Sequence, residues 1–220
     1  YPSVAAADVR IVGPAQFDFY ADRSFVVDEA AWRAGLGLEP GAPTVLYGAG
    51  AEHIAPHETQ HVDQLVDAIR RGVLPADLRV VLRRHPLDRS GRWDRFTDEP
   101  LVHVDDPGGV NRTAGRRPGD IDLGEAQVVG LCSSLAHADV HVSVSSTMTL
   151  DGAFFGRPQV GPAFDARPGG PFDRHARDLY RREHFVPIVA SGGMALVHDP
   201  ASFVAAVARA LHDPERDAEG

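Results

Sequence analysis

Cysteine is nearly absent from this chain, and methionine and the aromatic residues are scarce. The 220 residues include one cysteine and two methionines, and Phe, Trp and Tyr make up 7% of them. A single cysteine, Cys132, excludes an intramolecular disulfide framework and a cysteine-based zinc site, and it favours a reducing, cytoplasmic location. Its position in an apolar helical pattern is typical of a small buried side chain.

Long hydrophobic runs and an excess of positive charge are also missing. No apolar run approaches the roughly 18 residues that a membrane-spanning helix requires, and the N-terminal residues lack a signal-peptide pattern. Lys and Arg number 22 against 31 Asp and Glu, which gives a net charge of −9 with His neutral. The composition therefore predicts a globular domain with no general affinity for nucleic acid and no membrane span.

Short apolar runs alternate with helical patterns along most of the chain. The stretch 138–161 contains strand, loop, helix and strand in unbroken succession. Further strands are predicted at 9–12, 44–47, 78–82, 101–104, 186–190 and 194–197, and further helices at 24–37, 56–71, 125–136, 173–183 and from 200 onward. Strands that are apolar on both faces and alternate with helices predict an α/β fold, a Rossmann-like parallel sheet with helices on both faces.

The stretch 138–161 also carries the strongest candidate binding residues. Ser145, Ser146 and Thr147 lie where the strand turns into the helix, and a helix start offers free N–H groups and the positive end of the helix dipole to a phosphate. Asp151 follows four residues after Thr147, on the same helix face, where its carboxylate suits a ribose hydroxyl. The same residue types are also ordinary helix caps, so both interpretations stay open.

Other candidates follow the neighbouring strands. In a parallel sheet, ligands bind at the carboxyl ends of the strands, near the change in strand order. Gly48, His85 and Asp105 each follow a predicted strand, so we expect them at the same edge as Ser145–Thr147. Gly48 allows a backbone to approach a phosphate, and His85 can bind a phosphate or transfer a proton. Arginines of the loop after Asp105 either bind an anion or are solvated: Arg112, Arg116 and Arg117.

Two further motifs indicate other functions. His57–His61 matches the zinc-peptidase pattern H-E-x-x-H, but no third ligand follows at a suitable spacing, so we reject a metal site there. Gly48–Gly50 resembles half of a dinucleotide fingerprint without its third glycine. The second strand ends in Arg83 and Arg84, which suit NADP better than NAD, so an oxidoreductase remains an alternative.

Several segments together resemble the C-terminal, donor-binding half of GT-B glycosyltransferases, in particular the branch of CDP-glycerol glycerophosphotransferases and UDP-N-acetylglucosamine 2-epimerases. The segments are GPAQFDFY, TVLYGAG, VVLRRHP, ADVHVSVSSTMTLDGAFFGRPQV and REHFVPIVASGGMALVHDPASFVAAV. One departure is Val144, where the branch often has Tyr.

The resemblance implies a glycosyltransferase-type enzyme that binds a nucleotide-activated sugar or polyol, with UDP or CDP as the nucleotide, and that needs no metal or other cofactor. Ser145, Ser146 and Thr147 would contact the phosphates, with Gly48 beside them and Asp151 at the ribose. His85 would face the donor phosphate or act as an acid or base. A 2-epimerase-like enzyme and a non-catalytic binding module are the alternatives.

The resemblance also implies a division of the chain. Residues 1–41 would be an interdomain connector and leading helix, 42–213 the Rossmann-like donor-binding domain, and 214–220 a charged tail. Because the chain begins in mid-pattern at Tyr1, we expect a fragment whose N-terminal acceptor domain lies outside this sequence.

Overall fold

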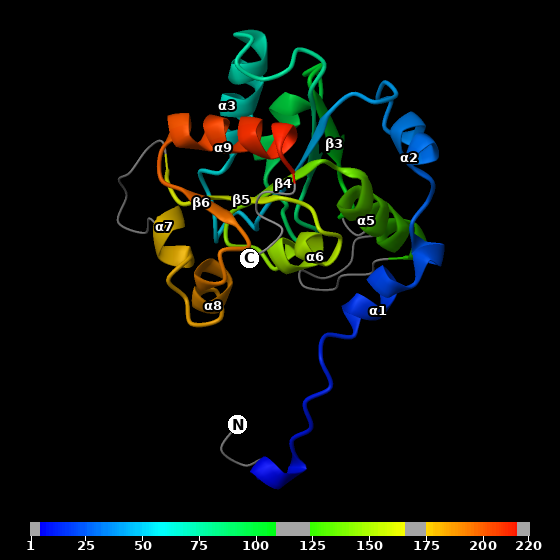
Figure 1. Cartoon of the computed structure of the whole chain (residues 1–220), viewed down its shortest axis with the longest axis vertical. Helices are drawn as coiled ribbons and strands as arrows, with labels where there is room; N and C mark the ends of the chain where they lie inside the picture. Colours follow the sequence, from blue (N-terminus) through cyan, green and yellow to red (C-terminus); the bar gives the residue numbers. More distant parts are fainter. Residues whose placement is uncertain (1–4, 109–123, 166–174, 215–220) are drawn as a thin grey trace.

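A single parallel sheet organises the molecule (Figure 1). The computed structural model describes residues 5–108, 124–165 and 175–214. Within these residues the sheet has six strands in the order β3-β2-β1-β4-β5-β6, and every neighbouring pair is parallel. The strands are β1 (Thr44–Gly48), β2 (Arg79–Arg83), β3 (Val102–Asp105), β4 (Val140–Ser143), β5 (Gln159–Pro162) and β6 (Ala195–Val197).

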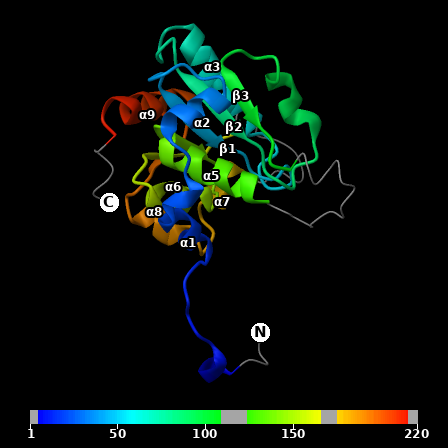
Figure 2. The ribbon, with the colours of Figure 1, turned by 90° about the vertical axis from the view of Figure 1, so that its right-hand side faces the viewer.

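Helices cover both faces of the sheet, as the sequence predicts. They are α1 (Gln16–Ala21), α2 (Glu29–Gly35), α3 (Thr59–Arg70), α5 (Glu125–His137), α6 (Met148–Phe154), α7 (Ala176–Leu179), α8 (Val186–Ala190) and α9 (Pro200–His212), with 3-10 turns η1 (Ala6–Asp8), η2 (Arg23–Phe25) and η3 (Gly91–Phe96). Figure 2 shows α1 and α2 beside α5, and α3 and α9 at the far end of the molecule from α1. The predicted Rossmann-like α/β fold is confirmed.

Alternate residues of the central strand enter different cores. Val45 and Tyr47 of β1 are fully buried in the larger core, to which α3, α9 and η3 contribute. Leu46, between them, is buried in the core formed with α1, α2 and α5. Successive side chains of a strand point to opposite faces. The apolar residues of β1 therefore contribute to the cores on both faces of the sheet.

Two predicted strands are wrong. The 9–12 segment is extended but pairs with no strand among the described residues, and Ile11 is 99% exposed. Residues 5–14 instead project away from the rest of the molecule (Figure 1). The segment predicted as a strand at 186–190 is the helix α8, with Pro187 in its first turn, where the missing proline N–H costs nothing. A short apolar run does not by itself distinguish strand from helix.

The helix predicted over 24–37 is two elements, the turn η2 and the helix α2. Asp28 caps α2, since its side chain accepts a hydrogen bond from the backbone N–H of Ala30. Asp199 caps α9 as predicted, through the backbone N–H of Ser202. Among the described residues, no helix combines the length and apolarity needed to cross a bilayer.

Candidate nucleotide site

The carboxyl ends of four strands lie level at one edge of the sheet. Gly48 pairs with Arg83 on one side and with Ser143 on the other, and Arg83 pairs with Asp105. The predicted alignment of these strand ends is therefore confirmed. Strand order changes direction between β1 and β4, the position at which parallel sheets open a crevice for ligands.

A cavity of about 170 Å³ lies at this change of direction. Its walls include Ala49 after β1, Arg84 and His85 after β2, Pro107 after β3, and Ser146 and Thr147 before α6, together with Leu131 of α5. Its volume is below the roughly 300 Å³ at which pockets begin to enclose a whole small molecule. The sheet thus brings together candidates that are up to about a hundred residues apart in the chain.

The loop before α6 is held in an unusual conformation. Among the described residues Ser145 is the one non-glycine residue with a positive φ, 46°, and its hydroxyl donates to the carbonyl of Leu179 at 3.1 Å. Ser146 lies one residue before the N-cap of α6, and its Oγ accepts from the backbone N–H of Met148, the first residue of the helix, at 3.2 Å. Ser145 therefore fixes the loop to α7, while Ser146 and Thr147 face the cavity.

His85 lies in a tight turn that follows β2. The backbone N–H of Leu87 donates to its Nδ1 at 3.1 Å, and the backbone N–H of Asp88 donates to its carbonyl at 2.8 Å. Burial lowers the pKa of the His85 imidazole; Asp88 opposes this shift, and His53 and Arg92 add to it. The ring is thus disposed to be neutral at physiological pH.

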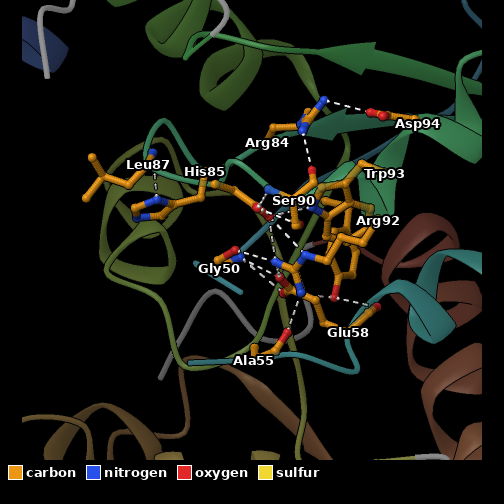
Figure 3. A network of polar contacts seen from close by, with 12 residues as sticks. Gly50, Ala55, Glu58, Arg84, His85, Leu87, Ser90, Arg92, Trp93 and Asp94 are labelled. Atoms are coloured by element: carbon orange, nitrogen blue, oxygen red, sulfur yellow. Dashed lines mark hydrogen bonds and ion pairs between the residues drawn. The ribbon is translucent and has the colours of Figure 1, made fainter. Parts of the chain in front are cut away.

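Arg92 joins the two loops that flank the cavity (Figure 3). Its guanidinium donates to the carbonyls of Gly50 at 2.7 Å and Ala55 at 2.6 Å, both in the β1–α3 loop. It also pairs with Glu58 at 2.8 Å and with Asp88, in the turn after His85, at 2.9 Å. One buried cation therefore sets the distance between the connection after β1 and the connection after β2.

The two carboxyl groups beside Arg92 differ in protonation. Burial raises the pKa of Glu58 to about 8, against the opposing effect of Arg92. Burial also opposes ionisation of Asp88, but hydrogen bonds from Ser90 and the nearby Arg92 outweigh it and lower the pKa of that carboxyl group. Burial thus favours the protonated form of Glu58, whereas the hydrogen bonds to Asp88 favour its ionised form.

Solved structures share this arrangement of strands and helices. UDP-GlcNAc 2-epimerase from Neisseria meningitidis, bound to UDP-GlcNAc, is 12% identical, with a TM-score of 0.59 over 99% of this chain and 51% of that one. The Methanocaldococcus jannaschii enzyme, in complex with UDP-GlcNAc and UDP, is 12% identical, with a TM-score of 0.55 over 96% and 50%. This is the fold of one half of a GT-B protein. The chain spans about half the length of these GT-B proteins.

A putative UDP-N-acetylglucosamine 2-epimerase from Listeria monocytogenes has the same GT-B fold, at 14% identity and a TM-score of 0.52 over 91% of this chain and 44% of that one. No protein-family model and no curated protein sequence matches the chain. The predicted resemblance to a GT-B C-terminal half is confirmed at the level of the fold.

Asp151, predicted at the ribose of a donor, contacts the helix α1. Its side chain is buried, and its Oδ1 accepts from Nε2 of Gln16 in α1 at 2.9 Å. Tyr20, also in α1, hydrogen-bonds the same carboxylate, and burial raises the pKa values of both Asp151 and Tyr20. A ribose contact stays a prediction, and it would require Gln16 to release the carboxylate.

Gly48 has a packing role that the sequence did not indicate. A Cβ atom placed there would lie 2.6 Å from Sδ of Met148, the first residue of α6. The absence of a side chain therefore lets α6 begin close to the end of β1. Ala49, the next residue, lines the cavity.

The H-E-x-x-H residues hold the core together. Both ring nitrogens of His61 are engaged, Nδ1 with the Tyr47 hydroxyl at 3.0 Å and Nε2 with the Phe164 carbonyl at 3.1 Å. Glu58 accepts from the backbone N–H of Gly50 at 2.8 Å. Within the part of the chain that the structure describes, no group of three His, Cys, Asp or Glu side chains is arranged to hold a metal.

The arginines considered for a dinucleotide phosphate have carboxylate partners. Arg83 pairs with Asp105, and Arg84 pairs with Asp94 at 3.2 Å and Asp106 at 3.4 Å. Because both guanidinium groups already have carboxylate partners, the structure does not support binding of an NADP phosphate by these arginines. The three loop arginines, Arg112, Arg116 and Arg117, lie outside the described residues.

Sequence reasoning missed Asp88 and Arg92. A signal was available, because Asp two residues before Ser is a common turn in which the carboxylate accepts from the later backbone N–H. That hydrogen bond is present, from Ser90 to Oδ1 of Asp88 at 2.9 Å. No sequence signal indicated that Arg92 reaches across to Gly50, 42 residues earlier.

Proposed function

We propose that this chain is the donor-binding domain of a GT-B glycosyltransferase or glycerophosphotransferase-like enzyme. It binds a nucleotide-activated sugar or polyol, with UDP or CDP as the nucleotide, and the donor group passes to an acceptor. The observation that carries the proposal is the cavity at the β1–β4 crevice, where His85, Ser146 and Thr147 converge. The cavity has room for phosphate groups beside the Ser146, Thr147 and His85 side chains, with the rest of the donor outside it.

The chemistry of the cavity supports phosphate binding. Hydroxyl and imidazole groups donate to phosphate oxygens, and they can stabilise the charge of a departing nucleotide without a metal or a further cofactor. The acceptor would be held by a second domain outside this sequence, with residues 1–41 as the connector. We also propose a cytoplasmic location, supported by the buried free thiol of Cys132.

An epimerase acting on a UDP-sugar is the second candidate. Structures that share the fold include UDP-GlcNAc 2-epimerases, and two of them contain UDP-GlcNAc. The two functions differ in their need for an acceptor. An epimerase converts its UDP-sugar alone, whereas a transferase releases the nucleotide when an acceptor is present.

Calorimetric titration of the chain with UDP, CDP and GDP tests the shared part of both candidates. We expect binding of UDP or CDP, weakened about tenfold in Ser146→Ala, as is usual for the loss of a hydrogen bond to a charged group. Ser191→Ala is the matched control, because Ser191 is an exposed residue after α8. The proposal would be refuted if none of the three nucleotides bound, or if Ser146→Ala and Ser191→Ala bound them with the same affinity.

A further inference from the structure

The turn after β2 dictates which nitrogen of His85 carries the proton. Leu87 donates its backbone N–H to Nδ1 of His85 at 3.1 Å. A backbone N–H can only donate, so Nδ1 must be an unprotonated acceptor. The neutral ring therefore carries its hydrogen on Nε2, and His85 lines the cavity with that tautomer.

The turn is rigid because Asp88 anchors it. Oδ1 of Asp88 accepts from the backbone N–H and the hydroxyl of Ser90, at 2.9 and 2.7 Å. Oδ2 accepts from Nε of Arg92 and from Nε1 of Trp93, both at 2.9 Å. Trp93 is fully buried, and the Asp88 side chain is 0% exposed. Figure 3 shows Ser90, Arg92 and Trp93 beside the turn that carries His85 and Leu87.

Protonation of His85 would break this arrangement. An imidazolium has a hydrogen on both nitrogens, so the Leu87 N–H would then face another N–H. Of the charged groups around the ring, Asp88 favours the imidazolium, whereas Arg92 of η3 and His53 of the β1–α3 loop oppose it. Arg84, at the same cavity, is paired with Asp94 and Asp106.

We propose that His85 meets a nucleotide phosphate as a neutral Nε2–H donor, held in that tautomer by the turn from Pro86 to Ser90. The inference rests on the proposed function. It separates the two roles that the sequence left open for His85: the residue binds the phosphate by donating a hydrogen bond and is not the acid that protonates a leaving group. An ion pair between imidazolium and phosphate is not required.

The tautomer is read directly from long-range ¹H–¹⁵N spectra of the ¹⁵N-labelled full chain at neutral pH, without nucleotide. The His85 signals are those that disappear in His85→Gln. We expect the pattern of a neutral ring protonated on Nε2. An imidazolium pattern, or a neutral ring protonated on Nδ1, would overturn the inference whatever the protein binds.

Binding of UDP and CDP then tests the donor role. His85→Ala is expected to weaken binding about tenfold, and His85→Gln, whose amide NH₂ can replace Nε2–H, to recover most of that loss. The ratio of the His85→Gln and wild-type Kd values should stay constant between about pH 7.5 and pH 8.5, because the neutral ring and the amide both donate without charge there. His212→Ala, at the exposed end of α9, is the control.

The possible failures are distinguishable. No binding of UDP, CDP or GDP by the wild-type chain would overturn the proposed function and, with it, the phosphate role of His85. Nucleotide binding that is weakened equally by His85→Gln and His85→Ala would overturn the donor role alone. A wild-type affinity that rises on acidification from about pH 8.5 to pH 7.5, relative to His85→Gln, would show imidazolium binding and would also overturn it.

Discussion

Arg92 faces two buried carboxyl groups, and its single charge satisfies one of them. Glu58 is 1% exposed, yet its environment includes the Gly50 backbone donor and the Tyr47 hydroxyl as well as the guanidinium. Asp88 accepts hydrogen bonds from the Ser90 backbone N–H and from Nε1 of Trp93, and these bonds favour its ionised form. Carboxyl groups that share one cation commonly separate in pKa in this manner.

This division predicts a pH dependence that belongs to Glu58. Its pKa is about 8 in the folded chain and 4.5 when exposed, so the stability it contributes is complete below pH 4.5 and is lost as the pH rises toward 8. Glu58→Gln keeps the acceptor oxygen and cannot ionise. We expect its free energy of unfolding, relative to wild type, to be higher at pH 8.5 than at pH 5.5 in urea titrations. The exposed Glu52→Gln serves as the control, and a difference that is independent of pH would contradict the assignment.

At the scale of the elements, α6 is packed unusually close to the sheet. A Cβ atom at Gly152 would collide with Nδ1 of His141 in β4 and with Nε2 of Gln159 in β5, both of which are buried. Gly152→Ala is therefore expected to lower the free energy of unfolding by roughly 1–3 kcal/mol. Thermal or urea unfolding measures this loss.

Gly35→Ala is the matched control for that substitution. Gly35 ends α2, and a Cβ there meets no atom within 4 Å, so the change should be neutral or slightly stabilising. Equal effects of the two alanines would show that the glycine at 152 is not required by packing.

The hydrogen bonds from Gln16 and Tyr20 of α1 to Asp151 of α6 give a second prediction at this scale. Asp151→Ala removes the acceptor of Gln16 and Tyr20, and leaves buried polar groups unpaired, so we expect a loss of about 1–3 kcal/mol in stability. Susceptibility of residues 14–22 to limited proteolysis should rise in parallel. A variant with unchanged stability and proteolysis would show that Asp151 does not hold α1.

Most helices and strands whose apolar pattern extends over many buried residues could be predicted from the sequence. The 59–70 helix has a full apolar stripe, and the 44–48 strand is buried throughout, so pattern and tertiary structure agree. The strand predictions at 9–12 and 186–190 failed because a few β-branched residues form a strand of a sheet only where a neighbouring strand offers its hydrogen bonds.

The candidate site was predictable to a lesser extent. Its edge follows from the topology of a parallel sheet, which placed His85, Ser146 and Thr147 correctly around one cavity. The contacts of Asp151 with α1, more than 100 residues away in sequence, depend on tertiary packing that no local pattern encodes. The same holds for Arg92.

For the whole molecule, two buried histidines set the acid limit of stability. Burial lowers the pKa of His61 to about 4 and that of His141 to about 3, from 6.5 when exposed. Each contributes stability above pH 6.5 that is lost as the pH falls toward these values, because the unfolded chain takes up the protons first. Glu58 acts in the opposite direction, so we expect maximal stability near pH 6.5.

Urea unfolding at half-unit intervals between about pH 4.5 and pH 8.5 measures this curve. A maximum near neutrality that moves to higher pH in Glu58→Gln would agree with the three assignments. Stability that rises steadily from pH 6.5 to pH 5 would contradict the role of the histidines.

The close approach at Gly152 also constrains how relatives of this chain can diverge. Glycine at this position, histidine at 141 and glutamine at 159 fill one space between them, so none of them can change freely alone. A related chain with alanine at position 152 therefore needs a smaller side chain at position 141 or at position 159. Residues 141, 152 and 159 should therefore be inherited as a set, even where the overall identity between two chains has fallen too low for ordinary alignment.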